Sequence, residues 1–153
     1  MALAVIEHIE HPLAKGNLTA DGVQWSAEAT STTNTYRTVE SVLINPPKLG
    51  KVIEFEFGIT WAQKCDGATD KAVGKVQARN AGGTWVDLMT EVTNASAGTT
   101  YEEKTYSGRF KPTADFNDIP FEIQVLVKSN GTTNNAVGKT KNSSYVKVIY
   151  VTS

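Results

Sequence analysis

The stretch from Lys51 to Trp61, KVIEFEFGITW, alternates large apolar side chains with polar or small ones. The apolar positions are Ile53, Phe55, Phe57, Ile59 and Trp61. Successive side chains of a strand point to opposite faces, so these five share one face, whereas a helix would scatter them around its circumference. The period of two predicts a central β-strand with one buried face.

The same period recurs towards the C-terminus. From Phe121 to Lys128 the apolar residues Phe121, Ile123, Val125 and Val127 fall on one face. Tyr145 to Val151 is rich in β-branched and aromatic residues, which predicts a last strand covered on both faces. Weaker strands are predicted at residues 23–29, 36–44, 73–79, 84–92 and 105–110.

Turn residues separate these segments at regular intervals, as in NPP at 45–47, AGG at 81–83 and NG at 130–131. No stretch of about 12 residues sustains a helical stripe. We expect an all-β fold, an antiparallel, jelly-roll-like β-sandwich of about eight strands.

The chain of 153 residues has the length of one domain. We expect residues 21–153 to form a single β-sandwich domain and residues 1–20 to form an extended N-terminal arm, because Pro12 and Gly16 interrupt the strand pattern. An arm with apolar residues can add a strand to a neighbouring subunit. An arm folded onto its own sandwich is the open alternative.

The composition and charge of the chain limit the kinds of binding partner that we expect. The net charge of -1 gives no reason to expect nucleic acid or an anionic membrane surface. No apolar run approaches the roughly 18 residues of a membrane span. Glu7 and His8 interrupt the apolar run of MALAVIEHIEH, so we expect no signal peptide and synthesis in the cytoplasm. The single cysteine, Cys65, excludes an internal disulfide and predicts a partly exposed, unreactive thiol.

The stretch VQARNAGGTWVDL at 76–88 predicts a hairpin. A three-residue turn with Gly82 in the left-handed region puts Val86 on the core face, opposite Val76, and Trp85 on the outer face near Arg79. A two-residue turn would reverse this and bury Trp85. The first arrangement buries more aliphatic surface, by a few kcal/mol at about 25 cal/mol per Å².

We therefore expect Trp85 to lie on the outer face, where the indole and Arg79 would form a contact patch. In the alternative, Arg79 only covers the indole within the chain. Trp25 and Trp61 are each in phase with the apolar face of their strand, which predicts that both are core residues.

No catalytic pattern is recognisable. His8 and His11 have no third ligand for zinc, and Glu54 and Glu56 are more typical of a solvated sheet face than of a carboxylate pair for catalysis. Gly-x-Ser-x-Gly, Walker and calcium-loop patterns are absent. We expect no enzyme, no catalytic residue, no metal site and no cofactor.

Four stretches carry a resemblance: QARNAGGTWVDL at 77–88, SGRF at 107–110, PFEIQ at 120–124 and NSSYV at 142–146. Together they resemble the β-sandwich virion structural proteins of tailed bacteriophages, of the head-decoration or auxiliary capsid type, over residues 50–150. The resemblance implies a protein on the virion surface that attaches to an assembled shell, often as a trimer, and reinforces it without catalysis.

The functional hypothesis is a non-enzymatic capsid decoration or stabilising protein that acts through multivalent subunit contacts. Its expected partners are copies of itself, as a homo-oligomer such as a trimer, and a major capsid or other virion protein. The candidate contact residues are Leu3, Val5, Ile6, Ile9, Arg79 and Trp85. The alternative is a carbohydrate-binding β-sandwich module, for which glycans are the partner and Trp85, Tyr101 and Tyr106 the candidate aromatics.

Overall fold

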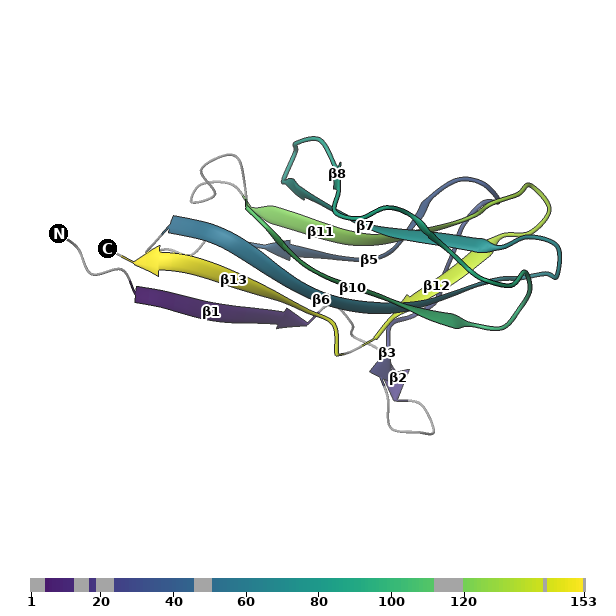
Figure 1. Cartoon of the computed structure of the whole chain (residues 1–153), viewed down its shortest axis with the longest axis horizontal. Coiled ribbons are helices and arrows are strands. Elements are labelled where there is room, and N and C mark those ends of the chain that lie inside the picture. Colours follow the sequence, from purple (N-terminus) through teal and green to yellow (C-terminus); the bar gives the residue numbers. More distant parts are fainter. Residues whose placement is uncertain are drawn as a thin grey trace.

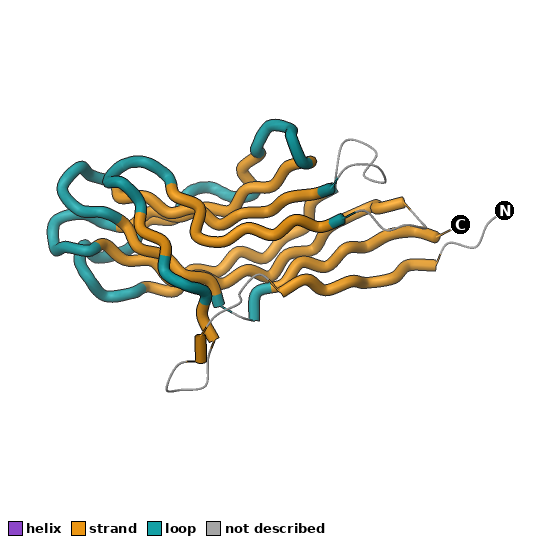
Figure 2. The backbone as a smooth tube through the Cα atoms, turned by 180° about the vertical axis from the view of Figure 1, so that it is seen from behind, coloured by secondary structure: helices purple, strands orange, loops and turns teal. Residues whose placement is uncertain are grey.

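The computed structural model describes residues 5–12, 17–18, 24–45, 51–111, 120–141 and 143–152. Within these ranges the regular elements are all strands, and they form two antiparallel sheets that face each other, with a small separate ribbon (Figures 1 and 2). The predicted antiparallel β-sandwich is confirmed. No described helix is long and apolar enough to span a membrane.

The six-stranded sheet is built on one long strand, β6 (Lys51–Cys65). On one side β6 pairs with β10 (Glu102–Phe110), and on the other side it pairs in tandem with β13 (Tyr145–Thr152) and β12 (Ala136–Thr140). The sheet continues through β1 (Val5–Pro12) beyond β13 and through β4 (Ala29–Thr30) beyond β12. β6 therefore positions most of this layer.

The opposite sheet has five strands. Its order is β5 (Arg37–Ile44), β11 (Phe121–Ser129) and β7 (Ala72–Asn80), followed by β8 (Val86–Asp87) and β9 (Val92–Thr93), which both pair with β7. The ribbon consists of β2 (Asn17–Leu18) and β3 (Gln24–Trp25). β6 and β11 carry the clearest alternation, and their inner faces meet in the core.

The predicted inner faces are buried. Phe55, Phe57, Ile59 and Trp61 of β6 are at most 1% exposed, and so are all four apolar residues predicted on β11. The rings of Phe55 and Phe121 stack with their centroids 3.9 Å apart and their planes at 13°. This contact joins the centres of the two sheets.

Two predicted strands are each divided into two short ones, and one strand of the expected domain, residues 21–153, was not predicted. Residues 84–92 contain β8 and the start of β9, and residues 23–29 contain β3 and the start of β4. The missed strand is β12, which is short and contains Gly138. A Cβ at Gly138 would lie 2.8 Å from Val39 and 2.9 Å from Val127, so glycine is needed where β12 approaches the opposite sheet closely.

Part of the expected arm lies in the sandwich. β1 runs antiparallel to β13, from Val5 opposite Thr152 to Pro12 opposite Tyr145. This stretch therefore pairs within its own chain, as in the alternative considered for the arm. Leu3 lies outside the described residues, and for Val5, Ile6 and Ile9 the structure describes the backbone.

Three burial predictions need correction. Cys65 is fully buried rather than partly exposed, because β6 continues to this residue, and burial raises the pKa of its thiol. Trp25 is only partly buried, because it lies in the small ribbon outside the sandwich. β13 is covered on its core face, where Val146 and Val148 are buried, but only in part on the other face, where Ile149 is buried and Tyr145 and Lys147 are partly exposed.

We predict that Phe121→Ala lowers the free energy of unfolding by about 3–5 kcal/mol, since it removes a buried ring between the sheets and leaves a cavity. Urea unfolding followed by tryptophan fluorescence measures the change. Leu43→Ala is the control, because Leu43 is 51% exposed on an edge strand and should change stability by less than about 0.5 kcal/mol. Similar losses in the two variants would contradict the central role of the ring stack.

Candidate functional site

The predicted hairpin at 76–88 exists, with a longer loop than expected. Gly82 has a φ of 80°, in the left-handed region as predicted. Val86 lies opposite Ala78, however, instead of opposite Val76, so the register is shifted by two residues. A shift of two leaves Trp85 in phase with the same face of the strand as predicted. Val86 is 48% exposed, contrary to the prediction, because β8 is only two residues long and lies at the sheet edge.

Trp85 is partly buried beneath Arg79, whose guanidinium carbon lies 4.3 Å from the centre of an indole ring. The guanidinium also donates hydrogen bonds of 3.2 and 3.0 Å to Glu122 and one of 3.2 Å to the Gly83 carbonyl oxygen. The cation–π contact fixes the loop against β7 and β11. Arg79 thus covers the indole within the chain, and a partner would meet the two side chains as one preformed surface.

The candidate contact residues do not form one site. Arg79 and Trp85 lie together beside the five-stranded sheet, whereas β1, with Val5, Ile6 and Ile9, is the edge of the six-stranded sheet (Figure 1). The fold therefore presents two separate candidate contact surfaces, one on each layer.

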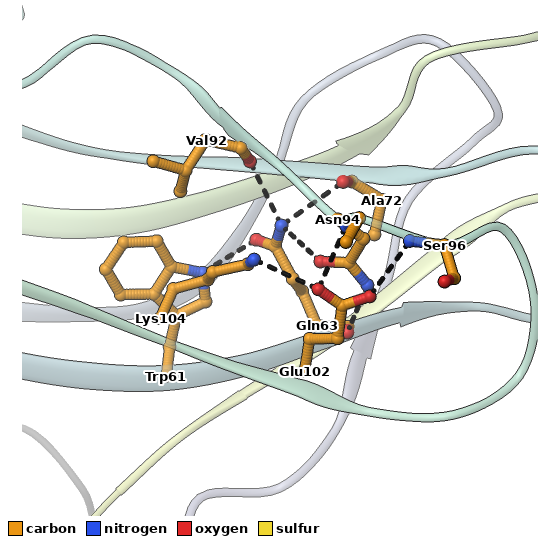
Figure 3. Close-up of polar contacts among 9 residues, drawn as sticks. Trp61, Gln63, Ala72, Val92, Asn94, Ser96, Glu102 and Lys104 are labelled. Atoms are coloured by element: carbon orange, nitrogen blue, oxygen red, sulfur yellow. Dashed lines mark hydrogen bonds and ion pairs between the residues drawn. The ribbon is translucent and has the colours of Figure 1, made fainter.

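A buried polar cluster joins β6 to β7 and to the segment that begins with β9 (Figure 3). The Trp61 indole Nε1 donates to Gln63 Oε1 at 2.8 Å. Gln63 Nε2 donates to Asn94 Oδ1 at 2.9 Å and also to the backbone carbonyls of Ala72 and Val92, and Asn94 Nδ2 donates to the Gln63 carbonyl at 2.9 Å. These bonds tie β6 to β7 and β9, which is a structural role.

Glu102 lies next to this cluster, and its side chain is partly exposed (Figure 3). Its carboxylate accepts backbone hydrogen bonds from Ala95 at 3.0 Å and Ser96 at 3.2 Å, and Lys104 lies 3.2 Å away. The bond from Ala95, supported by those from Ser96 and Lys104, lowers the pKa of the Glu102 carboxyl. A carboxylate held ionised in this way suits an anchor for the 94–102 loop rather than a proton donor.

Glu54 and Glu56, the carboxylate pair singled out in the sequence, are joined by a shared cation. Arg109 lies 3.3 Å from Glu54 and 3.5 Å from Glu56, and Lys147 lies 3.7 Å from Glu56. The four side chains form an ion-pair network on the outer face of the six-stranded sheet. This is the solvated sheet face that the alternation favoured.

The three aromatic residues considered for sugar binding do not converge. Tyr106 packs against Phe57 in the core, with ring centroids 6.2 Å apart, and Trp85 lies beside the other sheet. Tyr101 instead lies close to Trp25, with the ammonium of Lys139 between them, 4.3 Å from the Tyr101 ring centre and 4.8 Å from that of Trp25. This pairing was not predicted from the sequence, because β12 was not predicted.

A similar arrangement surrounds Tyr36 on the outer face of the five-stranded sheet. The ammonium groups of Lys75 and Lys128 lie 4.6 and 4.8 Å from its ring centre. Both lysines also have carboxylate partners, Asp87 at 3.0 Å and Glu91 at 3.7 Å. The Tyr36 hydroxyl donates to Glu91, so this cluster satisfies its charges internally.

We predict that Asn94→Ala lowers the free energy of unfolding by about 1–3 kcal/mol, because the buried main-chain carbonyl oxygen of Gln63 loses the hydrogen bond that it accepts from the Asn94 side chain. The control is Asn130→Ala, which removes a single exposed hydrogen bond to the Lys71 backbone and should cost less. Equal costs in urea unfolding would contradict the assignment of the cluster as a structural tie.

Glu102 predicts a pH dependence. A folded-state pKa below the unfolded value of about 4.3 means that the stabilisation is complete above that pH and is lost as the pH falls through the folded pKa. Glu102→Gln should be less stable than wild type at neutral pH and should lose less stability on acidification below about pH 5. Urea midpoints measured across this range test the prediction, and parallel curves for both proteins would contradict it.

The sequence matches no protein-family model and no curated protein. Among solved structures, a chain of the infectious bursal disease virus particle has a TM-score of 0.50 at 9% identity, covering 96% of this chain and 35% of that chain. The VP2 subviral particle of the same virus gives 0.47 at 10%, covering 96% and 37%. TmCBM61, solved in complex with β-1,4-galactotriose, gives 0.45 at 12%, covering 91% and 86%.

The chain therefore spans little more than a third of the virus chains that it matches. At such low identity the likeness concerns the fold. Chains of a virus particle and a carbohydrate-bound protein both occur among the similar structures, and the likeness to tailed bacteriophages expected from the sequence is not among these matches.

Proposed function

We propose that the chain is a non-enzymatic structural protein of a virus particle and, more narrowly, a capsid decoration or stabilising protein of a tailed bacteriophage. The observation that carries this proposal is the position of β1. Its eight residues pair with β13 on one side, and no other described strand pairs with the opposite side. The free N–H and C=O groups of such an edge can bind a strand of another chain.

The ion pairs of the outer faces support a non-enzymatic role. Glu54 and Glu56 are both paired with Arg109, and Glu102 is held by backbone donors and Lys104. These carboxylates therefore have structural partners within the chain. In this proposal the carboxylates stabilise the fold, and the sheet edges make the contacts with other proteins.

Two surfaces on opposite layers suit a subunit that sits between neighbours. In the proposed arrangement β1 binds a second copy within a trimer on the virion surface, and the Arg79–Trp85 surface binds a capsid protein. Each contact is modest, but copies around a symmetry axis bind simultaneously, so their affinities combine. The apolar residues Leu3, Val5, Ile6 and Ile9 would accompany the main-chain pairing.

Carbohydrate binding is the second candidate function. The observation that favours it is the convergence of Trp25 and Tyr101 around Lys139 on an outer sheet face. Aromatic rings beside a few polar groups are typical of small-ligand sites.

The test of the proposed function is co-sedimentation of the full-length chain with purified shells of the phage that encodes it. Ile6→Glu should lower the bound copies per shell by at least about tenfold, because a loss of roughly 1.4 kcal/mol per contact is multiplied over several subunits. Leu43→Glu is the matched control, since it places the same charge on an exposed edge residue of the other sheet.

Analytical ultracentrifugation of the same proteins measures the oligomeric state, for which a trimer is expected in the wild type. Absence of shell binding by the wild-type chain would overturn the proposal. Equal binding by Ile6→Glu and Leu43→Glu would remove β1 as the contact.

A further inference from the structure

Four side chains form a continuous row on the outer face of the six-stranded sheet, in the order Trp25, Lys139, Tyr101 and Lys64. The Lys139 ammonium lies between the rings of Trp25 and Tyr101, and the Lys64 ammonium lies 4.5 Å from the Tyr101 ring centre. We call this set the lysine–aromatic row. It draws on β3, β6, β12 and the residue before β10, so the pairing of β6 with strands on both sides assembles it.

The lysines of the row differ from most lysines of the sheet faces. Lys75, Lys104, Lys128, Lys141 and Lys147 each form an ion pair with a carboxylate. For Lys64 and Lys139 no such pair is present among the residues that the structure describes, and their ammonium groups contact aromatic rings alone. The row therefore holds two ammonium groups that form no ion pair within the described residues, which sets it apart from the internally paired Tyr36 cluster.

Further polar side chains lie next to the row, two of them carboxylates and one an ammonium group. The Tyr101 hydroxyl donates to exposed Glu28 at 2.5 Å, and Lys141, whose ammonium lies 5.7 Å from the Trp25 ring centre, pairs with Glu103 at 3.5 Å. Carboxylates next to unpaired ammonium groups suit a ligand that carries both hydroxyl donors and negative charge. An acidic peptide offers the charge but few hydroxyl groups that could donate to Glu28 and Glu103.

We propose that the lysine–aromatic row binds an acidic polysaccharide of the uronate class. Sugar rings stack on Trp25 and Tyr101, and the ligand carboxylates pair with Lys64 and Lys139 as these leave the ring faces. A neutral sugar would displace the same ammonium groups without offering them a carboxylate, so the row favours the charged polymer. This inference specifies the ligand of the second candidate function and is independent of shell binding through β1.

The experiment is isothermal titration calorimetry of the full-length chain with oligogalacturonate and with the same oligomer after complete methyl esterification, which removes the charge and keeps the sugar backbone. The wild type should bind the uronate at least about tenfold more tightly than the ester, and the affinity should fall with added salt. Lys139→Gln and Tyr101→Ala should each weaken uronate binding by about tenfold or more, whereas Tyr101→Phe, which keeps the ring, should weaken it less.

Lys75→Gln is the matched control, because it removes a lysine that covers a tyrosine ring on the other sheet, and it should leave the affinity unchanged. Circular dichroism confirms that each variant is folded. The proposal is overturned if the wild type does not bind oligogalacturonate, if the ester or poly-L-glutamate binds equally well, or if Lys139→Gln and Lys75→Gln have the same effect. None of these outcomes bears on co-sedimentation with shells, so the two proposals fail separately.

Discussion

The structure depends on the burial of one face of β6. This strand pairs with β10 along one side and with β13 and β12 in tandem along the other, and its inner residues from Phe55 to Cys65 are buried against the opposite sheet. A shift of one residue would turn every inner side chain to the solvent face, so burial fixes the register. The same register places Glu54 and Glu56 beside Arg109 and places Lys64 beside Tyr101 on the outer face.

Cations cover the aromatic rings of both outer faces. A lysine or arginine lies over the ring of Trp25, Tyr36, Trp85, Tyr101 and Tyr145. Each contact at a partly exposed site contributes about 0.5–1 kcal/mol, and it also keeps an apolar ring from becoming a non-specific adhesive patch. What distinguishes the clusters is whether the covering cation has a carboxylate partner: around Tyr36 it does, and around Tyr101 it does not within the described residues.

The strands whose apolar residues alternate with a period of two, β6 and β11, were predicted from the sequence, and so was the sandwich that they form. The sequence did not predict β12, because Gly138 weakens the strand signal at the position where Val39 and Val127 require it. Nor did it predict the Gln63–Asn94 cluster, because these residues meet only when β9 joins β7. The lysine–aromatic row was not predicted for the same reason. Its members come from four segments, and which segments become neighbours in the sheet cannot be read from local sequence.

The edge and the face of the six-stranded sheet can serve two partners at once. A strand added beside β1 extends the sheet in its own plane and leaves the outer face uncovered. β1 joins the sheet through β13, which pairs with β6 from Lys51 to Gly58, whereas the row lies where β12 pairs with β6 between Trp61 and Cys65. The two proposed surfaces therefore lie at opposite ends of β6, and a subunit held by its β1 edge would still present the lysine–aromatic row to a ligand.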